Sequence, residues 1–215
     1  IPILFTIGLG HPGAAIPFGD YSQMVAKEDN PPKYSGRYRT TDGRGNNAKH
    51  PWLGQGRRPY AVQQYDRGRA PSAPLPEPAK VIEQLWLRRK FQAAPNKTNA
   101  LMVWLATFIS HDLHYTHDGL DGADGRPRPW ENLHSSYLDL QPLYGHRPDA
   151  TTSVRQFEGG KLQHDQFAER RFGKFPVCAA LAILLSREHN YIAEQLATRY
   201  PDKFATDEDL FQQAR

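Results

Sequence analysis

Apolar residues recur at helical spacing from about Pro78 onward. Residues three and four apart lie on one side of a helix, so this spacing predicts an amphipathic helix with a buried stripe. The first example lies in 79–91, where five apolar residues precede a basic run. The five are Val81, Ile82, Leu85, Trp86 and Leu87. A second segment, 101–109, is apolar on nearly every side, which predicts a helix buried all round.

The strongest helical pattern begins at Pro176, since proline suits the first turn of a helix. Its apolar stripe continues as far as Tyr200 and consists of Leu181, Leu184, Leu185, Ile192 and Leu196. Thr206 then precedes a last helical segment, with Asp209 three residues later at the position of a capping box. No pair of segments shows the period of two that strands require, so we expect a mainly α fold.

The first 80 residues differ in composition from the rest. They contain 11 of the 18 prolines and 10 of the 17 glycines. Proline blocks helix interiors, and glycine raises the entropic cost of regular structure. We therefore expect 1–80 to form an extended, turn-rich wrap and 81–215 to be helical, within one domain that spans 1–215.

Charge and hydropathy argue against a nucleic-acid-binding surface and against a transmembrane helix. The formal net charge is +4 without a long basic block, so no nucleic-acid surface is expected. The longest apolar run, 101–109, is far shorter than the roughly 20 residues of a transmembrane helix. The single Cys178 cannot form an intrachain disulfide, which favours a reducing compartment such as the cytoplasm.

Both ends of the chain suggest a fragment. The chain starts Ile-Pro-Ile, without methionine or a basic leader, and stops within a helical pattern without a glycine or asparagine to end it. We therefore expect part of a longer protein, truncated within a domain.

The apolar segment 101–109 is followed by His111, Asp112, His114 and His117. Ionisable residues at the end of a buried helix are costly to bury, so they usually have a partner or a function. Two alternatives compete with a catalytic role: the helix simply reaches the surface here, or the histidines bind zinc. Zinc is disfavoured because His117 leaves the helix face that His111 and His114 share, and no cysteine or Glu-x-x-His partner is present.

Two further polar groups stand out. Residues 135–139 alternate hydroxyl, carbonyl and carboxylate oxygens, which suits a hard cation such as Ca²⁺, although an ordinary Ser/Asp turn explains them equally well. Residues 187–190 interrupt the apolar stripe of the long helix with Arg-Glu-His-Asn. A buried polar network would explain this interruption, but a solvated face is favoured.

Six segments taken in order carry a family resemblance. They are Tyr38–Gly43 with Asn46, Asn47, Pro51 and Gly54; Ile109–Leu113; Ser135–Leu140 with Pro142–Gly145; Phe157–Lys161; Arg187–Asn190; and Leu210–Arg215. Together they resemble the animal-type haem peroxidase superfamily, which includes myeloperoxidase and the cyclooxygenases. They are most similar to the fungal linoleate diol synthases and psi-factor-producing oxygenases. The resemblance implies a helical haem-peroxidase-like domain, of which this chain is the distal half.

The resemblance also implies roles for individual residues. His111 would be the distal haem histidine, which moves a proton between the two oxygens of a hydroperoxide. Asp112 would bind Ca²⁺ together with Ser135, the carbonyl group of Tyr137, and Asp139. The position of a further hydroxyl ligand is Gln141 in this chain.

A distal arginine would stabilise the leaving oxyanion, and Arg171 fits this position, with Arg170 as the alternative. The haem b group would be held non-covalently, because the positions of the two carboxylates that tether it in mammalian peroxidases carry none here. The resemblance gives His189 a structural role. It places the axial histidine and a radical-forming tyrosine beyond Arg215.

These implications favour a haem-dependent fatty acid dioxygenase, an oxidoreductase that forms oxylipins. Its partners would be O₂ and an unsaturated fatty acid of the linoleate type, or its hydroperoxide. A tyrosyl radical would remove a bis-allylic hydrogen atom, and O₂ would then add to the carbon radical that remains, with haem supplying the redox chemistry. Two alternatives stay open: a haem peroxidase that oxidises small donors, and an inactive truncated module.

Overall fold

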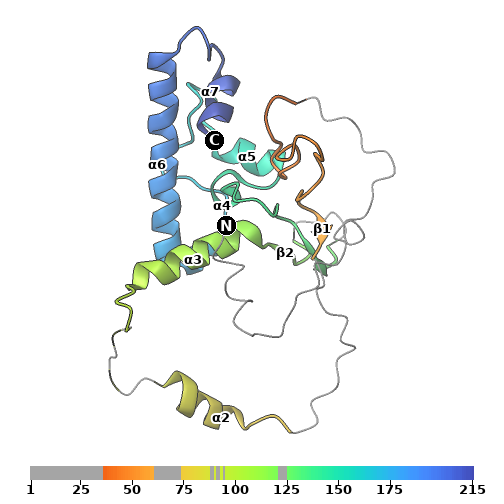
Figure 1. Ribbon diagram of the computed structural model, residues 1–215, viewed down its shortest axis with the longest axis vertical. Coiled ribbons are helices and arrows are strands. Elements are labelled where there is room, and N and C mark those ends of the chain that lie inside the picture. Colours follow the sequence, from red (N-terminus) through yellow and green to blue (C-terminus); the bar gives the residue numbers. More distant parts are fainter. Residues whose placement is uncertain (1–35, 61–73, 88–89, 91–92, 94, 121–124) are drawn as a thin grey trace. The chain divides into compact units, whose positions relative to one another are not determined.

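The computed structural model describes residues 36–60, 74–87, 90, 93, 95–120 and 125–215. All of them belong to one compact unit, Ser35–Arg215. The elements are β1 (Arg58–Pro59), α2 (Pro78–Val81), the π-helix η1 (Ile82–Trp86), α3 (Ala100–Leu113), β2 (Thr116–His117), β3 (Arg128–Asn132), α4 (Gln141–Tyr144), α5 (Pro148–Val154), the 3₁₀-helix η2 (Arg170–Lys174), α6 (Pro176–Arg199) and α7 (Asp207–Ala214). Helices dominate, so the mainly α prediction is confirmed (Figure 1).

The turn-rich first third is described only in part, because 1–35 and 61–73 lie outside the described residues. Residues 36–60 consist of turns and bends around β1. The helix expected in 79–91 is shorter than predicted: α2 passes into η1, which ends at Trp86. Its apolar stripe is exposed rather than buried, with Leu85 and Trp86 78% and 77% exposed.

A small antiparallel sheet was not expected. Its strand order is β1-β3-β2, with Arg58 and Thr116 both paired to Asn132. Two of the strands have only two residues, too short to show a period of two. The side chain of Asn132 joins the sheet to the end of α3, because it donates to the carbonyl oxygen of Leu113 at 2.8 Å and accepts from the amide of Tyr115 at 2.8 Å.

The helix α3 forms where the sequence predicts it, and Asn99 caps its N-terminus by accepting from the amide of Met102 at 3.3 Å. Burial on every side was wrong. Within the described residues only Phe108 and Asp112 of α3 are buried, while Leu101 and Val103 are 52% and 62% exposed. Hydropathy reports the apolar character of a helix but not which of its sides has a neighbour.

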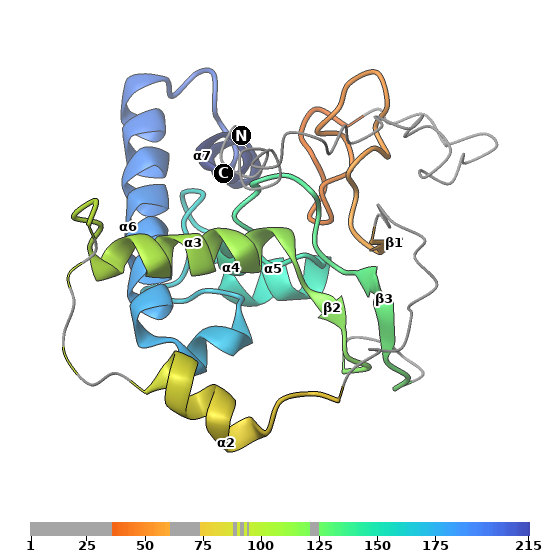
Figure 2. The same ribbon diagram turned by 60° about the horizontal axis from the view of Figure 1, so that its bottom comes forward.

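The long helix α6 crosses α3 near its own N-terminal end (Figures 1 and 2). Its buried face differs from the predicted leucine stripe, since Leu184 is 63% exposed. The buried residues are Cys178, Ala182, Ser186, His189 and Ala193. Small side chains face the neighbouring elements because they let the backbones approach closely. No helix among the described residues has the length and apolar content needed to cross a bilayer.

Two apolar clusters hold the helices together. One joins α4, α5 and α7 and consists of Leu143, Tyr144, Val154, Leu162 and Phe211. The other joins α3, η2 and α6 and consists of Phe108, Phe172, Cys178 and Ala182. The second cluster fixes the last turns of α3 against η2. The predicted cap of α7 is confirmed, because Thr206 Oγ1 accepts from the amide of Asp209 at 3.0 Å.

Candidate functional site

The ring of His111, in the last turn of α3, is fixed by one backbone hydrogen bond and two aromatic contacts. Its Nδ1 lies 2.8 Å from the carbonyl oxygen of Thr107. A carbonyl oxygen only accepts, so Nδ1 carries a proton, and in the neutral imidazole Nε2 holds the lone pair. The rings of Phe172 and Phe175 lie against the imidazole at centroid distances of 5.2 and 5.5 Å. In this tautomer Nε2 is the atom that can accept a proton.

Arg171, in η2, binds the end of α3 with its guanidinium group. Nη2 donates to the carbonyl oxygen of His111 at 3.4 Å, and Nη1 donates to that of His114 at 3.1 Å. Nε and Nη2 also bind both carboxylate oxygens of Glu169, at 2.8 and 2.5 Å. The Glu169 side chain is only 1% exposed, and its charge is matched by Arg171. The guanidinium also stacks on Tyr115, 4.1 Å from the ring centroid.

Arg170, the alternative, points elsewhere. Its Nη2 pairs with Asp118 Oδ2 at 3.0 Å, and both side chains are about half exposed. Arg171 therefore contacts the backbone of His111, whereas Arg170 pairs with Asp118.

A second histidine lies buried behind the end of α3. His134 Nδ1 lies 3.1 Å from the carbonyl oxygen of Asp112, so it donates there. Its ring contacts those of Tyr115 and His146 at 5.1 and 5.0 Å. Burial, with nearby His146 and Arg171, lowers the pKa of His134 to about 3. The residue is neutral at physiological pH and rigidly placed.

Asp112 is 1% exposed and faces the start of α4. Its two carboxylate oxygens accept from the amides of Leu140 and Gln141 at 3.1 and 2.8 Å. Burial raises the pKa of Asp112 to about 7, although the two amide bonds oppose the shift. The charge of Asp139 raises the pKa of Asp112 further.

The other three residues of the expected calcium site do come together. Ser135 Oγ donates to Asp139 Oδ2 at 2.9 Å and lies 3.4 Å from the carbonyl oxygen of Tyr137. Asp139 is 4% exposed and has two further partners: Arg39 Nε lies 3.0 Å away as an ion pair, and Asn46 Nδ2 donates at 2.9 Å.

The remaining histidines of the α3 end do not gather around a metal position. His114 Nδ1 lies 3.3 Å from the carbonyl oxygen of Ser110, and its ring stacks on Tyr60. His117 is buried, with Nδ1 accepting from the amide of Gly119. In the described part of the chain, no set of three or more histidine, cysteine, aspartate or glutamate residues could hold a metal ion. The zinc alternative therefore has no support there.

The polar run in α6 is a buried network at its centre, so the favoured solvated face was wrong for His189. This ring is 2% exposed and contacts the Tyr144 hydroxyl and the carbonyl oxygen of Gly160, each at 2.9 Å. Asn190 also binds the backbone of Leu162 at both its amide and carbonyl groups. Arg187 is exposed and pairs with Asp165. These contacts fit the structural role that the resemblance implies for His189.

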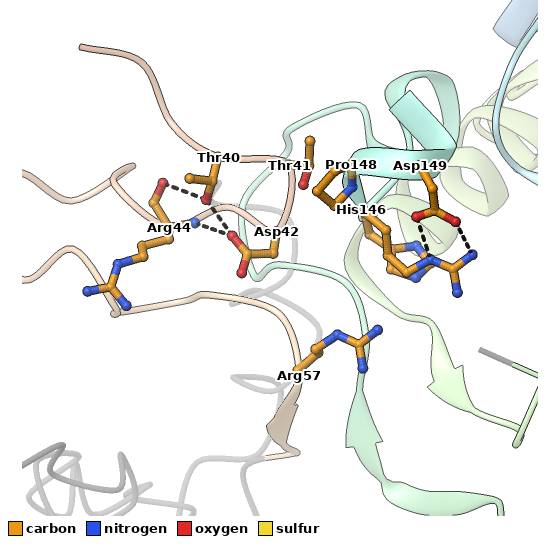
Figure 3. A pocket seen from close by; sticks show the side chains of 9 residues that line it. Thr40, Thr41, Asp42, Arg44, Arg57, His146, Pro148 and Asp149 are labelled. Carbon is orange, nitrogen blue, oxygen red and sulfur yellow. Dashed lines mark hydrogen bonds and ion pairs between the residues drawn. The ribbon is translucent and has the colours of Figure 1, made fainter. Parts of the chain in front are cut away.

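A hollow of about 410 Å³ lies between residues 36–60, the first described segment, and α5 (Figure 3). It is lined by Thr40, Thr41, Asp42, Arg44, Arg57, His146, Arg147, Pro148 and Asp149. Its acidic groups already have partners: Arg147 binds both oxygens of Asp149, and Asp42 accepts from the amide of Arg44 (Figure 3). It contains none of the residues expected at a haem site.

Sequence reasoning missed Glu169, Arg39 and the two aromatic residues beside His111. Glu169 stands directly before the two arginines, and a carboxylate at that spacing was the available signal. Arg39 lies 100 positions from Asp139, and no local pattern connects them. Phe172 and Phe175 are ordinary core residues in sequence, so only their contact with His111 distinguishes them.

Comparisons with known proteins match this arrangement to a family. The family model described as animal haem peroxidase matches residues 38–126 and 166–215. Psi-producing oxygenase A of Aspergillus fumigatus is 36% identical over 174 residues, which are 79% of this chain. Linoleate diol synthase of Gaeumannomyces graminis is 38% identical over 171 residues, which are 74% of this chain. The chain spans only 15% and 13% of the lengths of these two relatives.

Solved structures show the same fold. Peroxidase A of Dictyostelium discoideum superposes with a TM-score of 0.65 at 17% identity, over 84% of this chain and 50% of that one. The fatty acid alpha-dioxygenase of Oryza sativa superposes with a TM-score of 0.59 at 17% identity, over 82% and 35%. At this identity the likeness concerns the fold alone.

Proposed function

The chain belongs to the animal haem peroxidase family, and from that premise we propose that the protein containing it is a haem-dependent fatty acid dioxygenase that forms oxylipins. Its substrates would be O₂ and an unsaturated fatty acid of the linoleate type. The support comes from relatives at 36–38% identity, one named as an oxygenase and one as a linoleate diol synthase. Cytoplasmic location belongs to the same proposal and is supported by Cys178, a buried free thiol.

The side of α3 that carries His111 fits a haem group. Val103 and Thr107 lie two turns and one turn before His111 on that side, and Val103 is 62% exposed. Phe175 contacts the imidazole at the edge of the same surface. Val103 and Phe175 would contact the flat apolar macrocycle, and His111 Nε2 would be the proton acceptor that its reactive centre needs. Haem held there would supply the redox chemistry.

The observation that carries the mechanism is the tautomer of His111. Since Nδ1–H is donated to the carbonyl oxygen of Thr107, Nε2 is the basic atom. We propose that Nε2 takes the proton from the terminal oxygen of a hydroperoxide. As the O–O bond breaks, Nε2 returns that proton to the other oxygen, which departs as an alcohol. One side chain then serves as base and acid, so no free hydroxide is needed.

Arg171 contributes to this proposal as a positioning residue. Its bonds to Glu169 and to the carbonyl oxygens of His111 and His114 fix the helix end on which the imidazole stands. To stabilise a leaving oxyanion directly, as the resemblance implies, the guanidinium would have to give up part of these bonds. Calcium is left out of the proposal, because the residues expected to bind it are occupied by protein groups.

The test uses the full-length protein loaded with haem. We expect O₂ uptake with linoleic acid and none with stearic acid, which has the same chain length but no bis-allylic hydrogen. Oxidation of guaiacol by hydrogen peroxide without any O₂ uptake would contradict the dioxygenase proposal and favour a peroxidase that oxidises small donors. Failure to develop a Soret band after haem addition would favour the inactive module.

A further inference from the structure

The oxygens that the resemblance assigns to calcium do not fit the ion in this chain. A Ca²⁺ ion takes 6–8 oxygen ligands that point at one centre, with carboxylates supplying most of the charge. We propose that a protein counter-charge, the guanidinium group of Arg39, takes the place of calcium beside Asp139. The loop 135–141 would then be fixed by a metal-free ion-pair network. This inference is independent of the proposed reaction.

The carboxylate of Asp139 is already neutralised and hydrogen-bonded. Arg39 Nε lies 3.0 Å from Oδ1, and the Asp139 side chain is 4% exposed, so water screens this pair little. Asn46 Nδ2 donates to Oδ2 at 2.9 Å, and Ser135 Oγ donates to the same atom. A cation at Asp139 would have to displace the partly buried guanidinium of Arg39.

The space beside these oxygens is filled by backbone. Gly43 has φ +84° and lies so close that a Cβ atom there would meet Ser135 Oγ at 2.9 Å and Asp139 Oδ2 at 3.0 Å. The hydroxyl of Ser135 is turned toward Asp139, and the carbonyl oxygen of Tyr137 lies 3.4 Å from it. The oxygens therefore contact one another and Gly43 rather than a common empty centre.

The oxygens of Asp112 are also occupied by protein groups. Its two oxygens accept from the amides of Leu140 and Gln141. Gln141, at the expected position of a hydroxyl ligand, is used at both ends: Oε1 accepts from the amide of Ser135 at 2.7 Å, and Nε2 donates to the carbonyl oxygen of Thr41 at 2.9 Å. The oxygen of Gln141 could therefore bind an ion only by giving up its bond to the amide of Ser135.

A second arginine holds Arg39 in place. Arg215 Nη2 donates to the carbonyl oxygen of Thr40 at 3.1 Å, and Arg39 Nη2 donates to the carbonyl oxygen of Arg215 at 3.2 Å. The Asp139 carboxylate already has the charge of Arg39 beside it, so a divalent cation would bring an excess of positive charge. The network joins segments 176 positions apart.

The test compares metal content and thermal unfolding of the full-length protein, with Arg39→Met and its matched control Arg37→Met. Arg37 also pairs with an aspartate, Asp209, but its side chain is 61% exposed. We expect wild-type protein to unfold at the same temperature in 1 mM CaCl₂ and in 1 mM EGTA. Arg39→Met should lower the unfolding midpoint by at least about 5 °C, because it leaves a buried carboxylate unpaired. Arg37→Met should change it by less than about 1 °C.

Metal analysis before and after Asp139→Asn separates the outcomes. One calcium ion per chain that is lost in Asp139→Asn would overturn the proposal, as would an Arg39→Met protein as stable as wild type. Calcium that both proteins retain equally comes from elsewhere and leaves the proposal standing. If Arg39→Met does not fold, Arg39→Lys keeps the charge, and its unfolding midpoint should stay the same in CaCl₂ and EGTA. A midpoint that calcium raises in Arg39→Lys would also overturn the proposal.

Discussion

The Nδ1 atom of His111 lies 2.8 Å from the carbonyl oxygen of Thr107, one turn earlier in α3. His114 makes the same kind of contact to Ser110, at 3.3 Å. The two histidines differ in their surroundings: His111 lies between aromatic rings of η2 and the start of α6, whereas His114 is exposed beside Tyr60. Packing, rather than the local helix geometry, distinguishes a candidate catalytic base from a surface histidine.

This pair supplies a matched experiment. In the full-length protein, His111→Ala should slow activation by hydroperoxide by at least ~10²-fold, the usual size of a general acid–base contribution. His114→Ala should leave the rate within about twofold of wild type, because its side chain is exposed. Stopped-flow measurement of activation against hydroperoxide concentration provides the rates. A His111→Ala protein that activates at the wild-type rate would exclude the proton-transfer role.

Glu169→Gln should loosen the last turn of α3. The substitution keeps the size of the side chain but removes the charge that binds Arg171, at a cost of about 1.5–3 kcal/mol in the free energy of unfolding. Hydrogen exchange of the amides in 111–114 should become faster, since Arg171 also holds the carbonyl oxygens there. Arg170→Gln is the control, because the Arg170–Asp118 pair is exposed. Equal exchange in both variants would contradict the positioning role of Arg171.

His189 should make stability depend on pH. Nε2 donates to the carbonyl oxygen of Gly160 and Nδ1 accepts from the Tyr144 hydroxyl, so the bonded ring is neutral. Burial lowers its pKa below the ordinary 6.5, so the unfolded chain binds more protons below that value. The free energy of unfolding should therefore fall as pH falls below about 6.5.

Denaturant unfolding at pH 7.5, 6 and 5 measures this dependence. His189→Gln should be less stable at pH 7.5 but lose less stability on acidification than wild type. The exposed His164 gives the control His164→Gln, which should keep the wild-type slope. A wild-type slope in His189→Gln would show that other groups, such as His134, account for the whole effect.

Alanine substitutions at two glycines would distinguish the cost of backbone strain from the cost of close packing. Gly43 and Gly125 both have positive φ, +84° and +63°, but a Cβ atom at Gly125 would meet nothing within 4 Å. Gly125→Ala should cost about 1 kcal/mol, the penalty of a left-handed conformation. Gly43→Ala should cost at least about 2 kcal/mol more, because it forces Ser135 and Asp139 to move. Equal losses in urea unfolding would mean that the segments do not pack as closely as described.

The sequence by itself determined where α6 and α7 begin. Pro176 and Thr206 act on groups within three or four positions, so their effect is visible in a linear pattern. For α3 the sequence offered Asn96, Thr98 and Asn99 as caps, and the structure selects Asn99. The polar end of α3 was likewise visible, and with it the position of His111. Motif order was enough to indicate the family, since each motif is a short local segment.

Tertiary structure decided which sides of these helices are buried and which charges are paired. The fully buried face of α6 includes Cys178, Ala182 and His189, whereas Leu181 and Leu185 of the predicted stripe are only partly buried against the two clusters. Arg39 reaches Asp139 from 100 positions away, and Arg171 reaches the end of α3 from 60. A pairing of this kind depends on the distance between two groups in the folded chain. That distance does not follow from their separation in sequence, so no pattern of neighbouring residues could have shown it.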